Sequence, residues 1–125
     1  MADDWARLER QARGWALADP DPETAAALLH AVESGDEAYV RSCFAVPLEF
    51  GTAGLRGAVG PGPAHLCLAL VLRLGWAVGR YLKGQGLQVR GVVVGYDARP
   101  DSERFARALS ESLGRTGQYG SLSRS

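Results

Sequence analysis

A run of β-branched residues between two helical segments constrains the fold of this chain more than any other feature. Residues 89–96, with three consecutive valines at their centre, predict a strand that is apolar on both faces. The segment before it, residues 64–83, is mostly apolar and predicts a helix that is covered on most sides. After it, Phe105, Leu109 and Leu113 recur at helical spacing. Because a strand of this kind belongs in a parallel sheet covered by helices, the sequence predicts an α/β fold.

The first 46 residues predict a helical lead-in to this α/β segment. Apolar residues recur at spacings of three, four and three within residues 3–18: Trp5, Leu8, Ala12 and Trp15. We expect both tryptophans to lie in the core. Asp21 and Asp36 are suited to cap two further helices, and Gly35 is suited to end the first of these in left-handed geometry.

The domain boundaries follow from the changes in pattern along the chain. Leu48 and Phe50 predict a short strand, so residues 47–113 have the order strand, helix, strand, helix of a partial α/β domain. In residues 114–125 only Tyr119 and Leu122 are large and apolar, and we expect a disordered tail there. Two recognisable strands are few for an independently stable sheet.

Composition excludes several classes of function. Fourteen basic and fourteen acidic residues cancel, so the chain lacks the electrostatic footprint of a nucleic-acid or anionic-membrane binder. The longest apolar stretch, residues 66–82, contains two arginines and two glycines, and the N-terminus does not resemble a signal peptide. Cys43 and Cys67 have no metal-binding spacing, so we expect buried free thiols and a cytoplasmic protein.

The glycine-rich segment Gly51–Gly57 is one of two segments suited to binding a ligand. Its backbone N–H groups, the Thr52 hydroxyl and the Arg56 guanidinium are all donors that suit a phosphate group. The alternative is an ordinary glycine-rich turn with a surface arginine. The second segment, residues 97–100, follows the predicted strand. Ligand sites in α/β sheets lie at such carboxyl ends of strands.

Both segments resemble signatures of the phosphoglucomutase/phosphomannomutase (α-D-phosphohexomutase) family. Residues 48–57 (LEFGTAGLRG) are similar to its N-terminal signature, particularly in the branch of bacterial phosphoglucomutases and phosphopentomutases. Residues 92–99 (VVVGYDAR), followed by Ser102 and Phe105, resemble a strand, loop and helix of the same first domain. The resemblance covers roughly residues 36–113. It departs at His65-Leu66-Cys67, where that branch has a polar Arg-Met-Asn-like stretch.

The resemblance implies a role for several residues. Members of the family have four domains and transfer a phosphoryl group from a phosphoserine to a sugar phosphate, with Mg²⁺ held by an acidic loop. By resemblance, Thr52, Gly54 and Arg56 bind the substrate, and Arg56 stabilises phosphoryl charge. Arg99 is implied to lie near the same face, with Asp97 holding its loop. The alternative for Asp97 and Arg99 is an ion pair that only braces the loop.

The motifs that perform the chemistry in that family do not occur in this sequence. It has no phosphoserine loop, metal loop, sugar-specificity loop or C-terminal phosphate loop of the family type. We therefore expect the N-terminal part of a sugar-phosphate mutase that is inactive alone, because it has no catalytic serine and no Mg²⁺ ligands. Two alternatives stay open. One is a non-catalytic phosphate-binding or protein-interaction module, and the other is an enzyme completed by mutase domains in trans.

Overall fold

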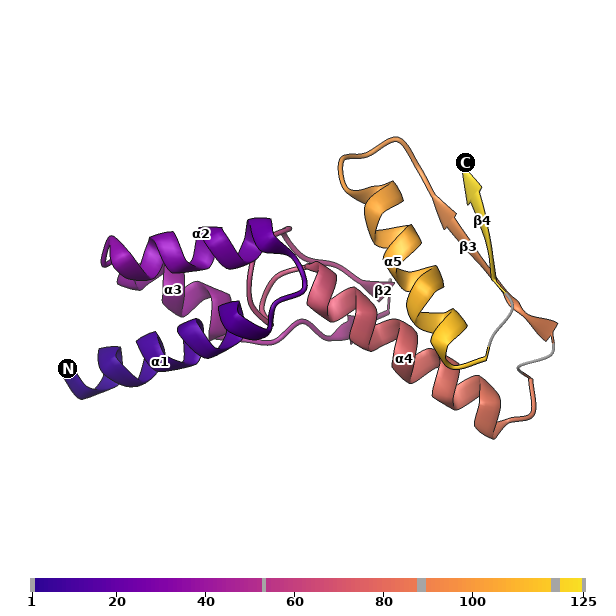
Figure 1. Cartoon of the computed structure of the whole chain (residues 1–125), viewed down its shortest axis with the longest axis horizontal. Coiled ribbons are helices and arrows are strands. Elements are labelled where there is room, and N and C mark those ends of the chain that lie inside the picture. The colour runs from indigo at the N-terminus through magenta and orange to yellow at the C-terminus, as the bar shows by residue number, and fades with distance from the viewer. Residues whose placement is uncertain (1, 53, 88–89, 118–119, 125) are drawn as a thin grey trace. The chain divides into compact units, whose positions relative to one another are not determined.

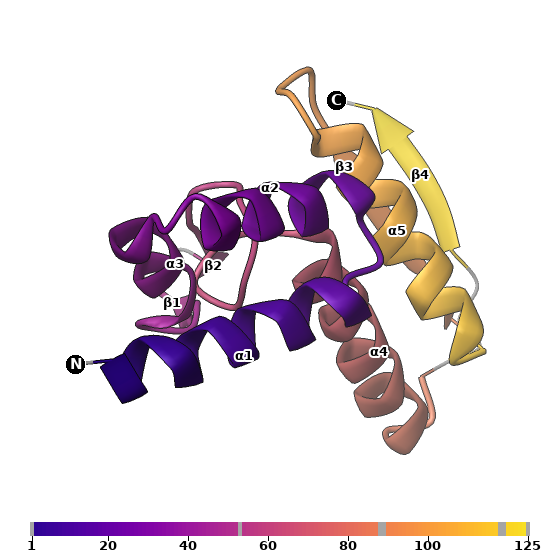
Figure 2. The same ribbon diagram turned by 60° about the vertical axis from the view of Figure 1, so that its left-hand side comes forward.

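The computed structural model describes residues 2–52, 54–87, 90–117 and 120–124. The chain divides into two compact units, Met1–Ala69 and Leu70–Ser125, which are described separately below. Figures 1 and 2 together label the elements of the first unit, which are α1 (Ala2–Ala18), α2 (Pro22–Glu33), α3 (Glu37–Phe44), β1 (Phe50–Gly51) and β2 (Gly54–Leu55). The second unit holds nearly all of α4 (Leu68–Gly84), with β3 (Val92–Tyr96), α5 (Ser102–Arg115) and β4 (Gly120–Arg124).

Three helices form the core of the first unit. Figures 1 and 2 both show α1 and α2 side by side. The core residues they share with α3 are Leu8, Ala12, Ala16, Leu28, Ala31, Val32, Val40 and Cys43. Trp5 and Trp15 pack against this cluster, and the Trp15 ring meets the Phe44 ring edge-on with centroids 6.0 Å apart. The predicted apolar face of the first helix is therefore confirmed, with both tryptophans on it.

The ends of these helices are fixed by the residues that the sequence indicated. The Asp21 carboxylate accepts a hydrogen bond from the Glu23 N–H at 3.0 Å, and Asp36 accepts one from the Tyr39 N–H at 3.2 Å. Gly35, with a φ of 72°, lies between α2 and α3 in the left-handed region. These caps keep the turns short, so the helices fold back on one another.

The glycine-rich segment forms a hairpin, which differs from the predicted strand. β1 pairs with β2 in antiparallel register, Phe50 opposite Leu55 and Gly51 opposite Gly54. We expected the strand at residues 48–50 to join the same layer as the valine-rich strand, but β1–β2 and β3–β4 are separate two-stranded sheets. The Phe50 side chain is 65% exposed. Glycines opposite each other at the turn allow the chain to reverse over two residues, which favours local pairing.

In the second unit α5 packs on β3, which confirms the α/β class. Val94 of the strand contacts Ala106 and Leu113 of the helix, and Leu109 packs beside them. Figure 1 shows α5 lying along the β3–β4 pair. β3 begins at Val92, after Gly91 in left-handed geometry, whereas the predicted strand began at Val89, which lies outside the described residues.

The prediction that the strand is buried on both faces is wrong for the chain as described. Val94, on the face toward α5, is 6% exposed, whereas its neighbour Val93 on the other face is 72% exposed. α4 also shows more surface than we predicted, because Trp76, Val78 and Tyr81 are exposed. The periodicity correctly identified apolar positions, but the described elements cover only one side of the β3–β4 sheet.

The described part of residues 114–125 contains the end of α5 and a short strand, and the predicted disordered tail stays a prediction. α5 continues to Arg115, and residues 120–124 form β4, parallel to β3 with Leu122 opposite Val94. A parallel ladder is held by backbone hydrogen bonds, which do not require apolar side chains. The sequence Gly-Ser-Leu-Ser-Arg therefore pairs although its composition gives little strand signal. Tyr119 lies outside the described residues.

Gly75 and Gly79 bring the backbone of α4 close to α5. A Cβ atom at Gly75 would lie 2.8 Å from the Ser112 Cβ, and one at Gly79 would overlap the Thr116 side chain. The Ser112 hydroxyl donates a hydrogen bond of 2.6 Å to the Leu72 carbonyl. Small residues on both helices thus allow a side chain of α5 to bond directly to the backbone of α4.

Among the glycines whose surroundings the structure describes, Gly62 is the position where a Cβ atom would be least tolerated. Its φ is 88°, and a Cβ atom there would lie 2.5 Å from the Cys43 carbonyl oxygen and 2.9 Å from the Cys43 Cβ. That carbonyl is also held by the Ala64 N–H, at 3.1 Å. The Cys43 carbonyl group could therefore move away from a side chain at residue 62 only by breaking this hydrogen bond.

We therefore predict that Gly62→Ala destabilises the chain more than Gly35→Ala does. Both glycines have positive φ, but no atom lies within 4 Å of a Cβ at Gly35. Gly35→Ala should cost about 1 kcal/mol for left-handed geometry, and Gly62→Ala at least about 1 kcal/mol more because of the backbone overlap. Urea unfolding followed by circular dichroism measures both, and equal losses would contradict the prediction.

Candidate functional site

The tip and the second strand of the β1–β2 hairpin hold the predicted phosphate-binding residues. Thr52 lies at the turn, Gly54 is in β2, and Arg56 is the first residue after β2. The side chains of Thr52 and Arg56 are exposed, and within the described residues neither forms a hydrogen bond or an ion pair. A guanidinium without a neighbouring carboxylate keeps all of its donors for an external anion.

The base of the hairpin is held by packing and backbone bonds. The Leu48 side chain fills the space beside Gly57, where a Cβ atom would lie 2.6 Å from its Cδ2. The Leu48 N–H donates to the Pro63 carbonyl at 3.0 Å, and the Leu66 N–H donates to the Ala58 carbonyl at 2.8 Å. Arg56 therefore extends from a segment that is fixed on both sides of the hairpin.

The side chains of Cys43, Cys67 and His65, near this segment, serve packing and not catalysis. Cys43 and Cys67 are both buried thiols outside any disulfide, as predicted, and burial raises the pKa of the Cys43 thiol. A thiol held in its neutral form is a poor nucleophile. The His65 ring stacks on Tyr39, and its Nδ1 lies 2.7 Å from the Pro61 carbonyl oxygen. His65 thus has a packing role, consistent with the absence of a catalytic partner in the sequence.

The loop after β3 is braced by Asp97 and Arg99. The Asp97 carboxylate accepts hydrogen bonds from Nε of Arg99 at 2.9 Å and from the Arg99 backbone N–H at 3.1 Å. The Asp97 N–H in turn donates to the Ser102 hydroxyl at 3.0 Å. The bonds from the Arg99 side chain and backbone lower the pKa of Asp97 to about 2. The ion pair between Asp97 and Arg99, which was the alternative to a substrate-binding role for these residues, is therefore present.

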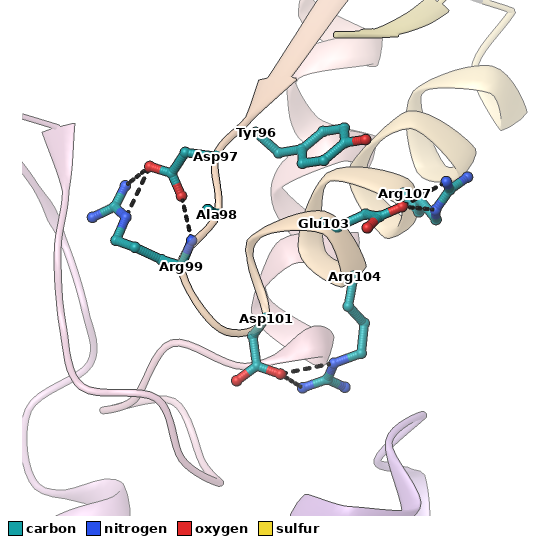
Figure 3. Close-up of a pocket in the computed structure, with 8 residues that line it drawn as sticks. All are labelled: Tyr96, Asp97, Ala98, Arg99, Asp101, Glu103, Arg104 and Arg107. Carbon is teal, nitrogen blue, oxygen red and sulfur yellow. Dashed lines mark hydrogen bonds and ion pairs between the residues drawn. The ribbon is translucent and has the colours of Figure 1, made fainter. Parts of the chain in front are cut away.

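The same loop borders a surface hollow of about 570 Å³, shown in Figure 3. It is lined by Tyr96, Asp97, Ala98, Arg99, Asp101, Glu103, Arg104 and Arg107. Figure 3 shows that the charged side chains form three ion pairs: Asp97 with Arg99, Asp101 with Arg104, and Glu103 with Arg107. The lining charges balance, so an incoming anion would have to exchange with a carboxylate.

The start of α5 has no side-chain cap. Asp101 occupies the N-cap position, but with a φ of 68° its side chain makes no capping hydrogen bond and pairs with Arg104 instead. The Ser102 hydroxyl is used by Asp97. A non-glycine residue in left-handed geometry is uncommon, and Figure 3 shows the Asp101 carboxylate directed at the Arg104 guanidinium.

The predicted site residues thus fall into two groups, one in each unit. Thr52, Gly54 and Arg56 lie together on the hairpin, and Asp97 and Arg99 lie together in the β3–α5 loop. Sequence reasoning missed Arg104 and Arg107, which line the hollow. Their spacing of three and four residues from Asp101 and Glu103, directly after a strand end, is the signal that could have found them.

The described side chains do not fit the Mg²⁺ ion that the family resemblance implies. Nowhere in residues 2–52, 54–87, 90–117 and 120–124 do three His, Cys, Asp or Glu side chains gather closely enough to hold a metal ion. In the same ranges no helix is both long enough and apolar enough to cross a bilayer.

Comparisons with known proteins agree with the resemblance seen in the sequence. A phosphopentomutase from Pongo abelii is 36% identical over 116 residues, and one from Homo sapiens is 34% identical over the same length; each alignment covers 86% of this chain and 19% of the relative. A phosphoglucosamine mutase from Halorhodospira halophila is 46% identical over 70 residues, covering 56% of this chain and 14% of the relative. The chain therefore spans about a fifth of the length of the curated phosphopentomutases it matches.

No solved structure matches the chain significantly. A family model described as "Phosphoglucomutase/phosphomannomutase, alpha/beta/alpha domain I" matches residues 47–119, which include both the hairpin and the β3–α5 loop. By this match over more than half of its length, the chain belongs to the phosphoglucomutase/phosphomannomutase family.

Proposed function

We propose that this chain is the N-terminal part of a sugar-phosphate mutase, in which the hairpin helps to bind the phosphoryl group of the substrate. The reaction would be an intramolecular phosphotransfer between the 1-position and the 6- or 5-position of a hexose or pentose. Relatives named phosphopentomutase and phosphoglucosamine mutase support this class of reaction. The observation that carries the proposal is an exposed Arg56 with no carboxylate partner among the described residues, on the same braced hairpin as Thr52.

Arg56 would act by electrostatics. A phosphoryl group in transfer spreads negative charge over its equatorial oxygens, and a fixed guanidinium stabilises that charge. Arg99 would take part through the donors that Asp97 leaves unused. Asp97 binds Nε and Nη2 of Arg99, whose side chain is 84% exposed, so the N–H groups of Nη1 still point to solvent.

The proposal assigns the covalent step to residues outside this chain. Positioning groups lower the barrier of a phosphoryl transfer but cannot replace the nucleophile that forms the covalent intermediate. Neither a serine in a family-type loop nor an acidic metal loop occurs in the sequence. The chain would therefore contribute binding and leave the chemistry to further domains, whether covalently joined or supplied in trans.

We predict that the purified chain does not turn over glucose 1-phosphate or ribose 1-phosphate in the presence of Mg²⁺ and glucose 1,6-bisphosphate. A coupled assay measures product, with a full-length family member as the positive control. Turnover above the blank, together with a phosphorylated serine found by mass spectrometry, would overturn the assignment of the covalent step to other domains.

We also predict that Arg56 binds phosphate directly. Titration with glucose 1-phosphate should shift the ¹⁵N amide signals of Gly54 and Gly57 with a dissociation constant that is roughly millimolar. Arg56→Ala should weaken binding about tenfold, and Arg56→Lys less, because lysine keeps the charge but loses the planar fork. Arg10→Ala is the matched control, since Arg10 is also exposed and forms no ion pair within the described residues. Equal binding by the Arg56 and Arg10 variants would contradict the role of the hairpin.

The Asp97–Arg99 pair gives a prediction for pH. Because the pKa of Asp97 is lowered to about 2 in the folded state, the pair stabilises the loop above the unfolded pKa, about 3.9, and this stabilisation is lost as pH falls through about 2. A carboxyl ¹³C titration should therefore place the Asp97 midpoint near 2, and Arg99→Ala should move it up toward the ordinary range. A wild-type midpoint near 4 would show that Arg99 is not held by Asp97 in solution.

A second function, as a non-catalytic interaction module, is favoured by one observation. Val93 is 72% exposed in the middle of a two-stranded sheet, whose open edges present unpaired backbone groups. Such a surface suits association with another protein. Stable binding of the chain to a full-length family member, unaffected by Arg56→Ala, would favour this function over phosphate binding.

A further inference from the structure

The positive charges of α4 differ from those on the other helices. Most arginines on α1, α3 and α5 are engaged by carboxylates, as the ion pairs of Arg7, Arg13, Arg41, Arg107 and Arg115 show; among the described residues Arg10 on α1 is the exception. α4 carries Arg73, Arg80 and Lys83 but no acidic residue, and in the part of the chain that the structure describes none of the three forms an ion pair. In a chain with equal numbers of acidic and basic residues, this concentrates unpaired positive charge on one helix.

These cations share one face of α4 with an exposed tryptophan. Arg73, Trp76, Arg80 and Lys83 follow at spacings of three, four and three residues, so they form a single stripe. Trp76 is 54% exposed, and the Arg80 guanidinium lies over its ring, 5.2 Å from the centroid. The indole thus presents a flat apolar surface next to two free charges.

A hollow of about 380 Å³ lies at this stripe, where α4 and α5 end. Its lining is Trp76, Arg80, Lys83, Arg115, Thr116 and Gly117, without a carboxylate among them. Arg115 is neutralised by Glu111 at 2.9 Å. Arg80 and Lys83 also border an adjoining hollow with Gly84. The charge available to a ligand therefore comes from Arg80 and Lys83.

These two cations are not required as caps for the helix ends. Basic residues in the last turn of a helix often serve its unpaired carbonyl groups. Here backbone N–H groups of residues 85–87 already donate to the carbonyls of residues 81–83. At the end of α5, residues 116–117 donate to the carbonyls of residues 113–114. Arg80 and Lys83 therefore keep their donors for a partner outside the helices.

We propose that this hollow binds a phosphate monoester, with the phosphate between Arg80 and Lys83 and its organic part against the Trp76 ring. A phosphate monoester is close to a dianion at neutral pH, which matches two unpaired cations, and guanidinium and ammonium groups both form charge-assisted bonds to phosphate oxygens. A sugar or a base has an apolar or planar face that packs on indole. The hollow is too small for a macromolecular surface, so the ligand is a small molecule.

This second site is independent of the proposed role of Arg56. Its residues belong to α4 and α5, whereas the hairpin lies in the other compact unit. Failure of one site in an experiment would therefore leave the signals of the other unchanged.

The test follows the indole ¹H–¹⁵N signal of Trp76 in the full chain, assigned by its loss in Trp76→Phe from among three tryptophans. Inorganic phosphate, glucose 6-phosphate and adenosine monophosphate are titrated in turn at constant ionic strength, with uncharged glucose as a control. We expect a saturable shift with all three phosphates at roughly millimolar dissociation constants, and tighter binding of at least one monoester than of inorganic phosphate.

Amino-acid substitutions distinguish a specific binding site from nonspecific electrostatic attraction of anions. Arg80→Ala/Lys83→Ala should weaken binding about tenfold or more, because two charge-assisted contacts are lost, whereas Arg10→Ala and Arg56→Ala should leave the Trp76 shift unchanged. All substituted side chains are exposed, so an unchanged circular dichroism spectrum verifies the fold. No saturable Trp76 shift, or an equal shift in the double variant, would overturn the site. Monoesters that bind no more tightly than inorganic phosphate would overturn the role given to Trp76.

Discussion

The second unit depends on how closely α5 approaches both of its neighbours. On one side, glycines of α4 let the Ser112 hydroxyl reach a backbone carbonyl of that helix. On another side, Ala106 and Leu113 pack on Val94 of β3. The alanines and the serine on α5 make this possible, because larger side chains would hold the helices and the strand apart. The same helix then positions the arginines of the β3–α5 hollow and the end of the Trp76 hollow.

Local signals in the sequence predicted the elements well. The caps at Asp21 and Asp36, the left-handed Gly35 and the apolar face of α1 all depend on interactions within a few residues or on one helix face. Strand pairing could not be predicted in the same way. Whether Phe50 pairs with Leu55 or with a distant strand depends on contacts that periodicity does not encode, and β4 had too few apolar residues to be noticed. For the candidate site, motif resemblance predicted roles for Thr52, Arg56 and Arg99, which stay predictions, whereas the pairing of Arg104 and Arg107 required the loop geometry.

The arginines of this chain are used in two distinct ways. Those around the β3–α5 loop are each held by a carboxylate, which fixes the loop and leaves the hollow without net charge. Arg56 and the cations of α4 have no such partner among the described residues. An exposed ion pair adds little to stability, whereas an unpaired guanidinium keeps its full attraction for an anion. The distribution of carboxylates therefore decides which of these arginines keep donors for the phosphate binding that we propose.

The open face of β3 has a consequence for how the molecule behaves in solution. Val93 on this face and the strand edge beside it form a short, uncharged template with high β-propensity. Two molecules that meet along it would each hide apolar area and complete backbone bonds that water now satisfies. The fraction of associated chains would therefore depend on protein concentration. Dilution, or a charged residue at Val93, would shift the association equilibrium toward the monomer.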